Sequence, residues 1–117
     1  MERKQYRQVV FYRHYYEEFY STLESKVKLK ITWTIDLIES IERVPSKYLE
    51  HLTGTEGLYE IRVSHRSNIY RIFCFFDEGR LVIAISGFQK KTQRTPRNQI
   101  RRAERIRKEY FDEKDKR

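Results

Sequence analysis

The sequence contains few of the residues that build covalent cross-links or metal sites. Of its 117 residues one is a cysteine, Cys74, and three are histidines, His14, His51 and His65, spread along the chain. A single cysteine cannot form an internal disulfide, and scattered histidines lack the spacing of a metal cluster. We therefore expect no metal, no cofactor and a reducing cytoplasm as the location of this protein.

Long apolar segments are also absent. The longest uninterrupted apolar runs, 72–76 and 81–85, have five residues each, whereas a membrane-spanning helix needs about 20. The start of the chain leads into no apolar secretory segment. The chain has only two prolines and four glycines. Its 15% of aromatic residues argues against disorder. At this length the sequence predicts a single domain over residues 1–117, with no membrane partner.

Positive charge is abundant instead, and it is concentrated in the second half of the chain. Residues 1–57 hold nine Lys/Arg and nine Asp/Glu, whereas residues 58–117 hold sixteen and eight and carry the whole formal charge of +8. Between Lys90 and Lys108 nine basic residues accompany one acid, Glu104. Such segregation is typical of polyanion-binding proteins, because phosphate contacts release counterions. The alternative is a solvated helix face, but such faces usually mix the two signs.

The apolar pattern predicts an α+β domain in the order β-α-α-β-β-β-α, with a small antiparallel sheet, an N-terminal helix pair and a basic C-terminal helix. A first strand is expected at 9–12, and the period is helical from about His14 to Val44, with a break near Ser25. A connecting loop over 45–57 then precedes the remaining strands, which are expected at 58–64, 69–76 and 80–88.

Two local features of the helices can be predicted more closely. In the second helix, Leu29 and Trp33 lie beside the main apolar stripe, so we expect this helix to be buried over a broad arc. In the last helix, Thr95 is expected as the N-cap. There Tyr110 falls on the apolar stripe, which indicates a core position.

Strand pairing places two arginines side by side. If the first hairpin loop is 65–68, Arg62 opposes Arg71, and opposed residues share a face with Cβ atoms about 4.5–5.5 Å apart. Glu60 lies on the same face. The arrangement therefore predicts either a phosphate clamp or a diagonal Glu60–Arg71 salt bridge on an exposed sheet face that also carries Phe73 and Phe75.

The last strand adds a lysine to this face. A two-residue turn at 78–79 places Lys90 on the same face as Arg71, and residues 81, 83 and 85 on the apolar face. A one-residue bulge at that turn would bring Lys91 to the arginines in place of Lys90. The sequence does not separate these two lysines.

A cluster of Arg and Lys side chains can stabilise the charge that builds on phosphate oxygens in a transition state. RNA cleavage suits such a cluster, since the 2′-hydroxyl is an internal nucleophile that needs only positioning and activation. A lysine among other cations has a lowered pKa and can then act as a base. Further RNA-binding candidates are His65 and Arg66 in the first hairpin loop, and Arg94 and Arg97 in the basic segment before and within the last helix.

Three segments, 57–63 (Gly-Leu-Tyr-Glu-Ile-Arg-Val), 68–73 (Asn-Ile-Tyr-Arg-Ile-Phe) and 87–96 (Gly-Phe-Gln-Lys-Lys-Thr-Gln-Arg-Thr-Pro), carry a family resemblance. They are similar to the HigB-like (phage-derived Gp49-like) branch of the RelE toxin superfamily. The resemblance implies a compact domain of a type II toxin–antitoxin system that cuts mRNA on the ribosome. It also implies a cognate antitoxin, commonly a helix-turn-helix protein.

Position by position, the resemblance implies that Arg62 and Arg71 hold and stabilise the scissile phosphate. Lys90 and Lys91 would add charge and are candidates for proton transfer. Glu60 departs from the pattern, because several relatives have a basic residue in that strand. Two alternatives remain: a non-catalytic RNA- or DNA-binding module that acts through the last helix, and an inactive toxin-fold protein that binds a partner.

Overall fold

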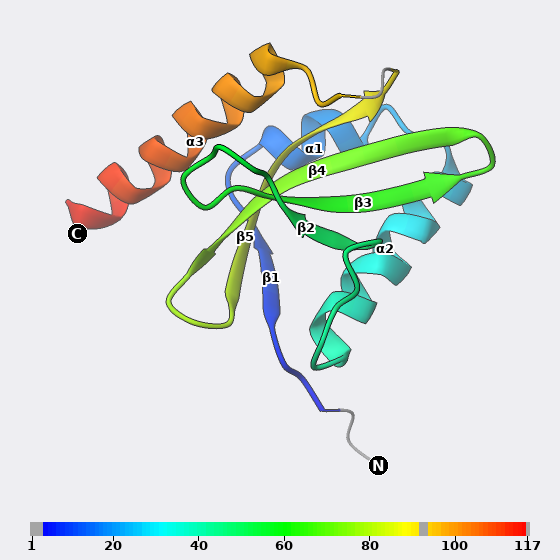
Figure 1. Ribbon diagram of the computed structural model, residues 1–117, viewed down its shortest axis with the longest axis horizontal. Helices are drawn as coiled ribbons and strands as arrows, with labels where there is room; N and C mark the ends of the chain where they lie inside the picture. The colour runs from blue at the N-terminus through cyan, green and yellow to red at the C-terminus, as the bar shows by residue number, and fades with distance from the viewer. Residues whose placement is uncertain (1–3, 92–93, 117) are drawn as a thin grey trace.

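The computed structural model describes residues 4–91 and 94–116 (Figure 1). It confirms the α+β class, with one strand more than expected. The elements in chain order are β1 (Gln8–Phe11), α1 (Tyr15–Tyr20), α2 (Ser25–Ser40), β2 (Leu49–His51), β3 (Tyr59–His65), β4 (Asn68–Asp77), β5 (Leu81–Lys90) and α3 (Arg97–Asp115). Among the described residues, no helix is both long and apolar enough to cross a membrane.

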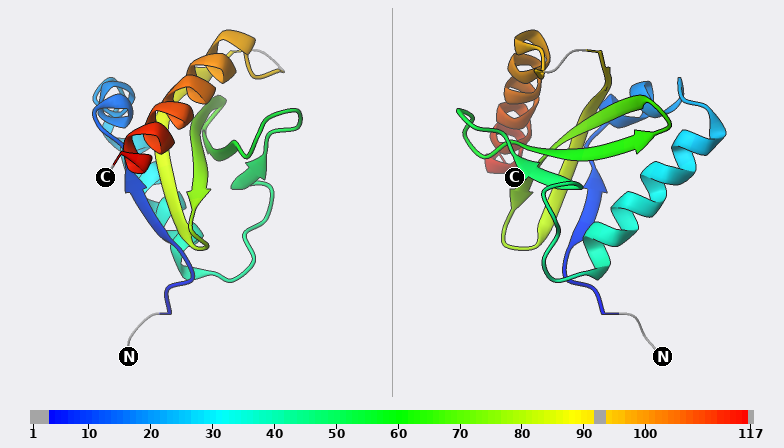
Figure 2. Two further views of the ribbon diagram at one scale, coloured as in Figure 1. Left: turned by 90° about the vertical axis from the view of Figure 1, so that its left-hand side faces the viewer. Right: turned by 45° about the vertical axis from the view of Figure 1, so that its right-hand side comes forward.

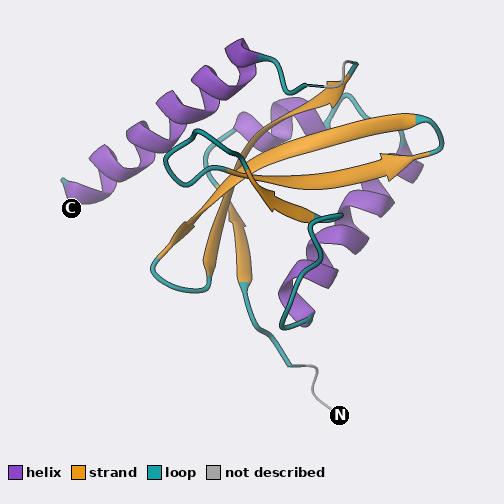
Figure 3. Cartoon of the chain, viewed as in Figure 1, coloured by secondary structure: helices purple, strands orange, loops and turns teal. Residues whose placement is uncertain are grey.

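All five strands form one sheet in the order β1-β5-β4-β3-β2 (Figure 3). Neighbouring strands are antiparallel except for β1, which pairs with β5 in parallel. The expected loop over 45–57 is therefore wrong in part, because it contains β2. This strand has only three residues, and the sequence Leu-Glu-His lacks the β-branched run that signals a strand. Its pairing with β3, Leu49 opposite Ile61, makes it a strand.

The sheet lies between two helical layers (Figure 2). Residues of α1 and α2, among them Val27 and Ile31, form one apolar cluster with Ile61 and Ile72 of the sheet. A second cluster lies on the other face, where Ile106 of α3 packs with side chains from β4 and β5, namely Phe73, Phe75, Ile83, Ile85 and Phe88. The expectation of an exposed face around Phe73 and Phe75 is therefore wrong, because α3 covers that part of the sheet.

Helix α2 is buried along a narrower stripe than expected. Its buried residues are Val27, Ile31, Thr34 and Ile38. Leu29 and Trp33 are 70% and 47% exposed, so the broad buried arc is wrong. A helix that packs on one sheet buries only the side that faces it, and these two residues lie on the outer side.

The turn between β4 and β5 differs from the expected one. Asp77 pairs with Leu81, so the loop has three residues, 78–80, instead of two. As a result Ile83 and Ile85 face α3 and not the α1–α2 layer, which corrects the expected placement of 81, 83 and 85. Two residues of β5, 85 and 86, then lie opposite Phe73 in a bulge. This second shift restores the alternation, so that Lys90 ends opposite Ile69, on the face of Arg71.

Gly87, directly after the bulge, allows α1 to approach β5. A Cβ atom at this position would lie 2.4 Å from the ring of Phe19. Glycine in a strand interior often marks such a close approach. The packing therefore gives a physical reason for the glycine that begins the segment 87–96.

Candidate functional site

Arg62 and Arg71 lie directly opposite each other on β3 and β4, as the pairing rule predicts. Their surroundings differ: the Arg71 side chain is 6% exposed and that of Arg62 is 29% exposed. Both side chains stand on the sheet face that α3 covers further along β4. In Figure 1 the β3–β4 hairpin extends away from α3, and this leaves its outer end uncovered by that helix.

Lys90 belongs to the same group of cations. Burial lowers the pKa of Lys90, and the charges of Arg71 and Arg62 lower it further, against the opposing effect of Glu60 and Glu50. Burial and the charge of Arg62 likewise lower the pKa of Arg71. Because these charges act on one another, we treat Arg62, Arg71 and Lys90 together and call them the basic cluster.

Each arginine of the basic cluster has an acidic neighbour. Arg62 Nη1 lies 2.6 Å from Glu50 Oε2, in a pair that is partly open to solvent. Arg71 Nε lies 3.8 Å from Glu60 Oε1, and both side chains are 6% exposed. The diagonal Glu60–Arg71 pair therefore exists as an ion pair, but its separation exceeds hydrogen-bond length. With three cations and two carboxylates, the group retains a net positive charge.

Arg71 makes few hydrogen bonds for a buried cation. Its Nη1 donates to the carbonyl of Tyr70 at 3.1 Å. Its Nε has no hydrogen-bond partner among the described residues, although it is buried. Buried polar groups are nearly always paired, so an unpaired N–H of a guanidinium indicates a place for a ligand acceptor. A phosphate oxygen fits this role, because guanidinium donors match phosphate geometry.

The other basic candidate residues differ from this group in being exposed. Lys91 is exposed and follows the last residue of β5. Arg66 is exposed at the two-residue tip of the β3–β4 hairpin, with a φ of 58°. Arg94 is exposed before α3, and Arg97 is the exposed first residue of that helix.

His65 is not brought to the basic cluster. In the alternation of β3 it follows Ile61 and Val63, on the face of the α1–α2 layer. Its Nε2 lies 3.6 Å from Glu24 Oε1, at the start of α2. The four-residue loop expected at 65–68 is in fact a two-residue turn, because His65 and Asn68 still pair.

Two polar residues of the site were not anticipated. Glu50 lies on β2, the strand whose sequence has no strand signal. Thr95 was expected to cap α3, but the N-cap is Pro96 and no side chain caps the helix. The Thr95 hydroxyl instead donates to Glu60 Oε2 at 2.7 Å. Within the same sequence motif, Thr92 and Gln93 lie outside the described residues.

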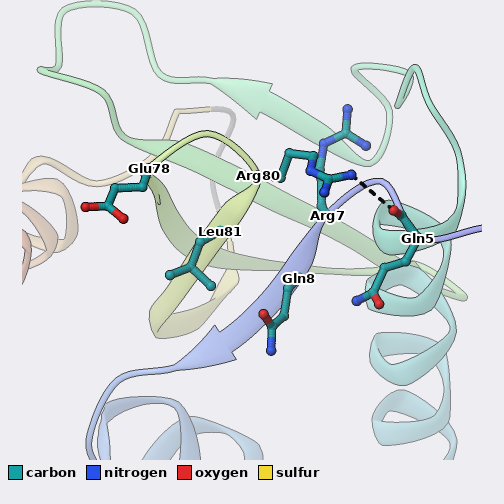
Figure 4. Close-up of a pocket in the computed structure, with 6 residues that line it drawn as sticks. All are labelled: Gln5, Arg7, Gln8, Glu78, Arg80 and Leu81. Carbon is teal, nitrogen blue, oxygen red and sulfur yellow. Dashed lines mark hydrogen bonds between the residues drawn. The ribbon is translucent and has the colours of Figure 1, made fainter.

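A surface pocket lies at the opposite end of the sheet, where β1 begins and β5 follows its turn (Figure 4). Its lining includes Arg7 and Arg80, and Arg80 Nη1 donates to the carbonyl of Gln5 at 3.4 Å. Arg7 binds three carbonyl groups at and beyond the end of α2. No residue predicted from the sequence to form the site lines this pocket. Its arginine contacts therefore support the fold.

The fold and the basic cluster together define a small basic α+β protein with a cationic, partly buried site on one sheet face. A family model described as phage derived protein Gp49-like (DUF891) matches residues 18–108. The chain therefore belongs to this family, which is part of the RelE/toxin-like superfamily. No curated protein matches the sequence. The chain is thus a RelE-type, toxin-like module.

Proposed function

We propose that this protein is the toxin of a type II toxin–antitoxin system, of the HigB-like branch, and that it cleaves mRNA in the cytoplasm on the ribosome. The observation that carries the proposal is the buried guanidinium of Arg71, whose Nε has no hydrogen-bond partner among the described residues. Family membership supports the toxin-like role. The partners that follow are ribosome-bound mRNA and an antitoxin of the helix-turn-helix type.

In the proposed reaction the ribose 2′-oxygen attacks the adjacent phosphorus, and the bond to the 5′-oxygen of the next nucleotide breaks. The products are a 2′,3′-cyclic phosphate and a 5′-hydroxyl. Arg71 and Arg62 stabilise the charge that builds on the non-bridging oxygens. Lys90, whose pKa is lowered by burial and by its arginine neighbours, is neutral more often than an ordinary lysine. The neutral amine can take the proton of the 2′-hydroxyl, and the resulting ammonium can give a proton to the leaving 5′-oxygen. Lys91, Arg66, Arg94 and Arg97 supply charge to the flanking phosphates.

The decisive experiment compares two substitutions that remove the same charge. Arg71→Gln removes the central guanidinium, whereas Arg80→Gln acts at the opposite end of the sheet, beside the pocket of Figure 4. Each protein is induced in cells, and growth and the 5′ ends of mRNA are measured. We expect the rate of mRNA cleavage by Arg71→Gln to fall roughly 10²–10³-fold, which is the usual effect of losing one transition-state hydrogen-bond donor. Arg80→Gln should resemble the wild type.

Cleavage that persists in Arg71→Gln at the wild-type rate would contradict the proposal. Thermal unfolding of both variants separates loss of the site from loss of the fold. Cleavage of the same mRNA without ribosomes shows whether the reaction needs them.

A second function has one specific observation in its favour. Exposed basic residues recur on one side of α3 at helical spacing, namely Arg97, Arg101, Arg105 and Lys108. Such a stripe fits a non-catalytic module that binds RNA or DNA through this helix. In that case, replacing Arg101 and Arg105 by Gln would abolish binding, and Arg71→Gln would weaken it only slightly.

A further inference from the structure

The hydroxyl of Thr95 donates a hydrogen bond to one oxygen of the buried Glu60 carboxylate. Glu60 is 5% exposed on β3, and its Oε2 accepts a hydrogen bond of 2.7 Å from Thr95. Its other oxygen, Oε1, is the one that lies 3.8 Å from Arg71 Nε. The carboxylate therefore makes its close contact with the neutral hydroxyl and not with the cation.

A buried carboxylate that bonds a hydroxyl and not the arginine beside it is unusual. Arginine and carboxylate groups normally form short, often bidentate pairs, because charge-assisted hydrogen bonds are about twice as strong as neutral ones. Here the guanidinium remains beyond hydrogen-bond distance of the carboxylate, and the part of the chain that the structure describes offers its Nε no other partner. If Glu60 paired closely with Arg71, a phosphate would have to displace the carboxylate in order to bind.

We infer that Thr95 is a positioning residue: its hydroxyl holds Glu60 away from Arg71 and so keeps the guanidinium available to an RNA phosphate. This inference rests on the proposed function and adds a residue to it. It also gives a role to the threonine of the Thr-Pro segment, which caps no helix.

Removal of the Thr95 hydroxyl should move the Glu60 carboxylate toward Arg71. In Thr95→Val the side chain keeps its shape but cannot donate, so Oε2 loses its partner. An unsatisfied buried carboxylate oxygen is costly, and Arg71 Nε is the cation nearest to this carboxylate. Glu60 should then pair with Arg71 and neutralise it. Thr95→Ser retains the donor and serves as the conservative control.

The test measures binding of the purified protein to a short single-stranded RNA with 2′-O-methyl riboses, which lacks the nucleophile and is not cleaved. Affinity is measured over a range of salt concentrations for wild type, Thr95→Val, Thr95→Ser, Glu60→Gln and the double variant Thr95→Val/Glu60→Gln. Each phosphate contact on a single strand contributes about −0.7 to the slope of log affinity against log salt. A purely structural role of Thr95 would not change this slope.

We expect Thr95→Val to bind roughly tenfold more weakly, as for the loss of one charge-assisted contact, with a slope reduced by about 0.7. Thr95→Ser should equal the wild type. Glu60→Gln should bind at least as tightly as the wild type, and the double variant should match Glu60→Gln. That rescue identifies Glu60 as the group that Thr95 restrains.

Two results would overturn the inference: wild-type binding by Thr95→Val, or a double variant as weak as Thr95→Val alone. Arg71→Gln in the same assay separates this inference from the proposed function. If Arg71→Gln binds weakly and Thr95→Val binds normally, only the inference fails. If Arg71→Gln binds as the wild type does, Arg71 is no phosphate ligand and both fail.

Discussion

Asp77 and Arg71 are two buried charged residues on the same face of β4, and they differ in how well hydrogen bonds satisfy their charges. Asp77 lies at the end of the strand that α3 covers, where it accepts hydrogen bonds of 2.7 Å from both Tyr110 and Lys114 of that helix. Arg71 lies toward the other end, with one backbone hydrogen bond and a carboxylate at 3.8 Å. Both residues are 5% exposed, so burial does not distinguish them.

The difference indicates which charge serves the fold and which serves a ligand. A buried charge stabilises a protein only when its partners replace the water it has lost. Asp77 has such partners, and they fasten α3 to the β4–β5 turn. The Nε of Arg71 has no such partner within residues 4–91 and 94–116, so a ligand can supply it. Three substitutions or conditions test this comparison, from the largest expected effect to the smallest.

The largest effect on stability should come from Asp77→Asn. The free energy of unfolding should fall by about 2 kcal/mol, because a hydrogen bond to a charged group contributes about 1.5–3 kcal/mol and two such bonds are weakened. Denaturant unfolding measures this change. Asp112→Asn is the matched control, since Asp112 pairs with Lys108 at 2.6 Å on the exposed surface. Exposed pairs contribute about 0–1 kcal/mol, so equal losses in the two variants would contradict the assignment.

A second, smaller effect should appear in acid. Burial disfavours the charged form of Asp77, but the hydrogen bonds from Lys114 and Tyr110 outweigh it, and the pKa lies below the ordinary 3.8. A carboxyl with a lower pKa in the folded state contributes stability above its ordinary pKa, and this is lost as the pH falls through the folded value. Lys114→Met should therefore flatten the fall in stability below about pH 5. An unchanged acid limb would show that Lys114 does not stabilise the charge.

The smallest effect on stability should come from the double substitution Arg71→Met/Glu60→Gln. Replacing both partners of a buried ion pair by uncharged side chains is often neutral or stabilising, and the amide oxygen at position 60 can still accept the hydrogen bond of Thr95. We expect the free energy of unfolding to change by less than about 1 kcal/mol, while RNA cleavage is lost. A loss of more than about 2 kcal/mol would place the pair of Arg71 and Glu60 with Asp77, among the residues that maintain the fold.

The sequence alone predicted more of the site than of its surroundings. The pairing of Arg62 with Arg71 follows from the register of one hairpin, where strand alternation is a local rule. Lys90 lies on the expected face for a different reason. The turn before β5 is one residue longer than expected, which moves the following side chains to the other face of the sheet. The bulge at 85–86 moves them back, so Lys90 is again on the face of Arg71. Local pattern could not reveal the bulge.

What the sequence determined by itself is the alternation of side chains along each strand and the concentration of positive charge in the second half, because both depend only on residue order. The tertiary structure decided which charges are covered and which carboxylate stands beside each cation. Glu50 reaches Arg62 through a strand that only pairing creates, and Thr95 reaches Glu60 from a segment 35 residues away. Such contacts depend on how separate elements pack together, and this packing cannot be predicted from the residues that are neighbours along the chain.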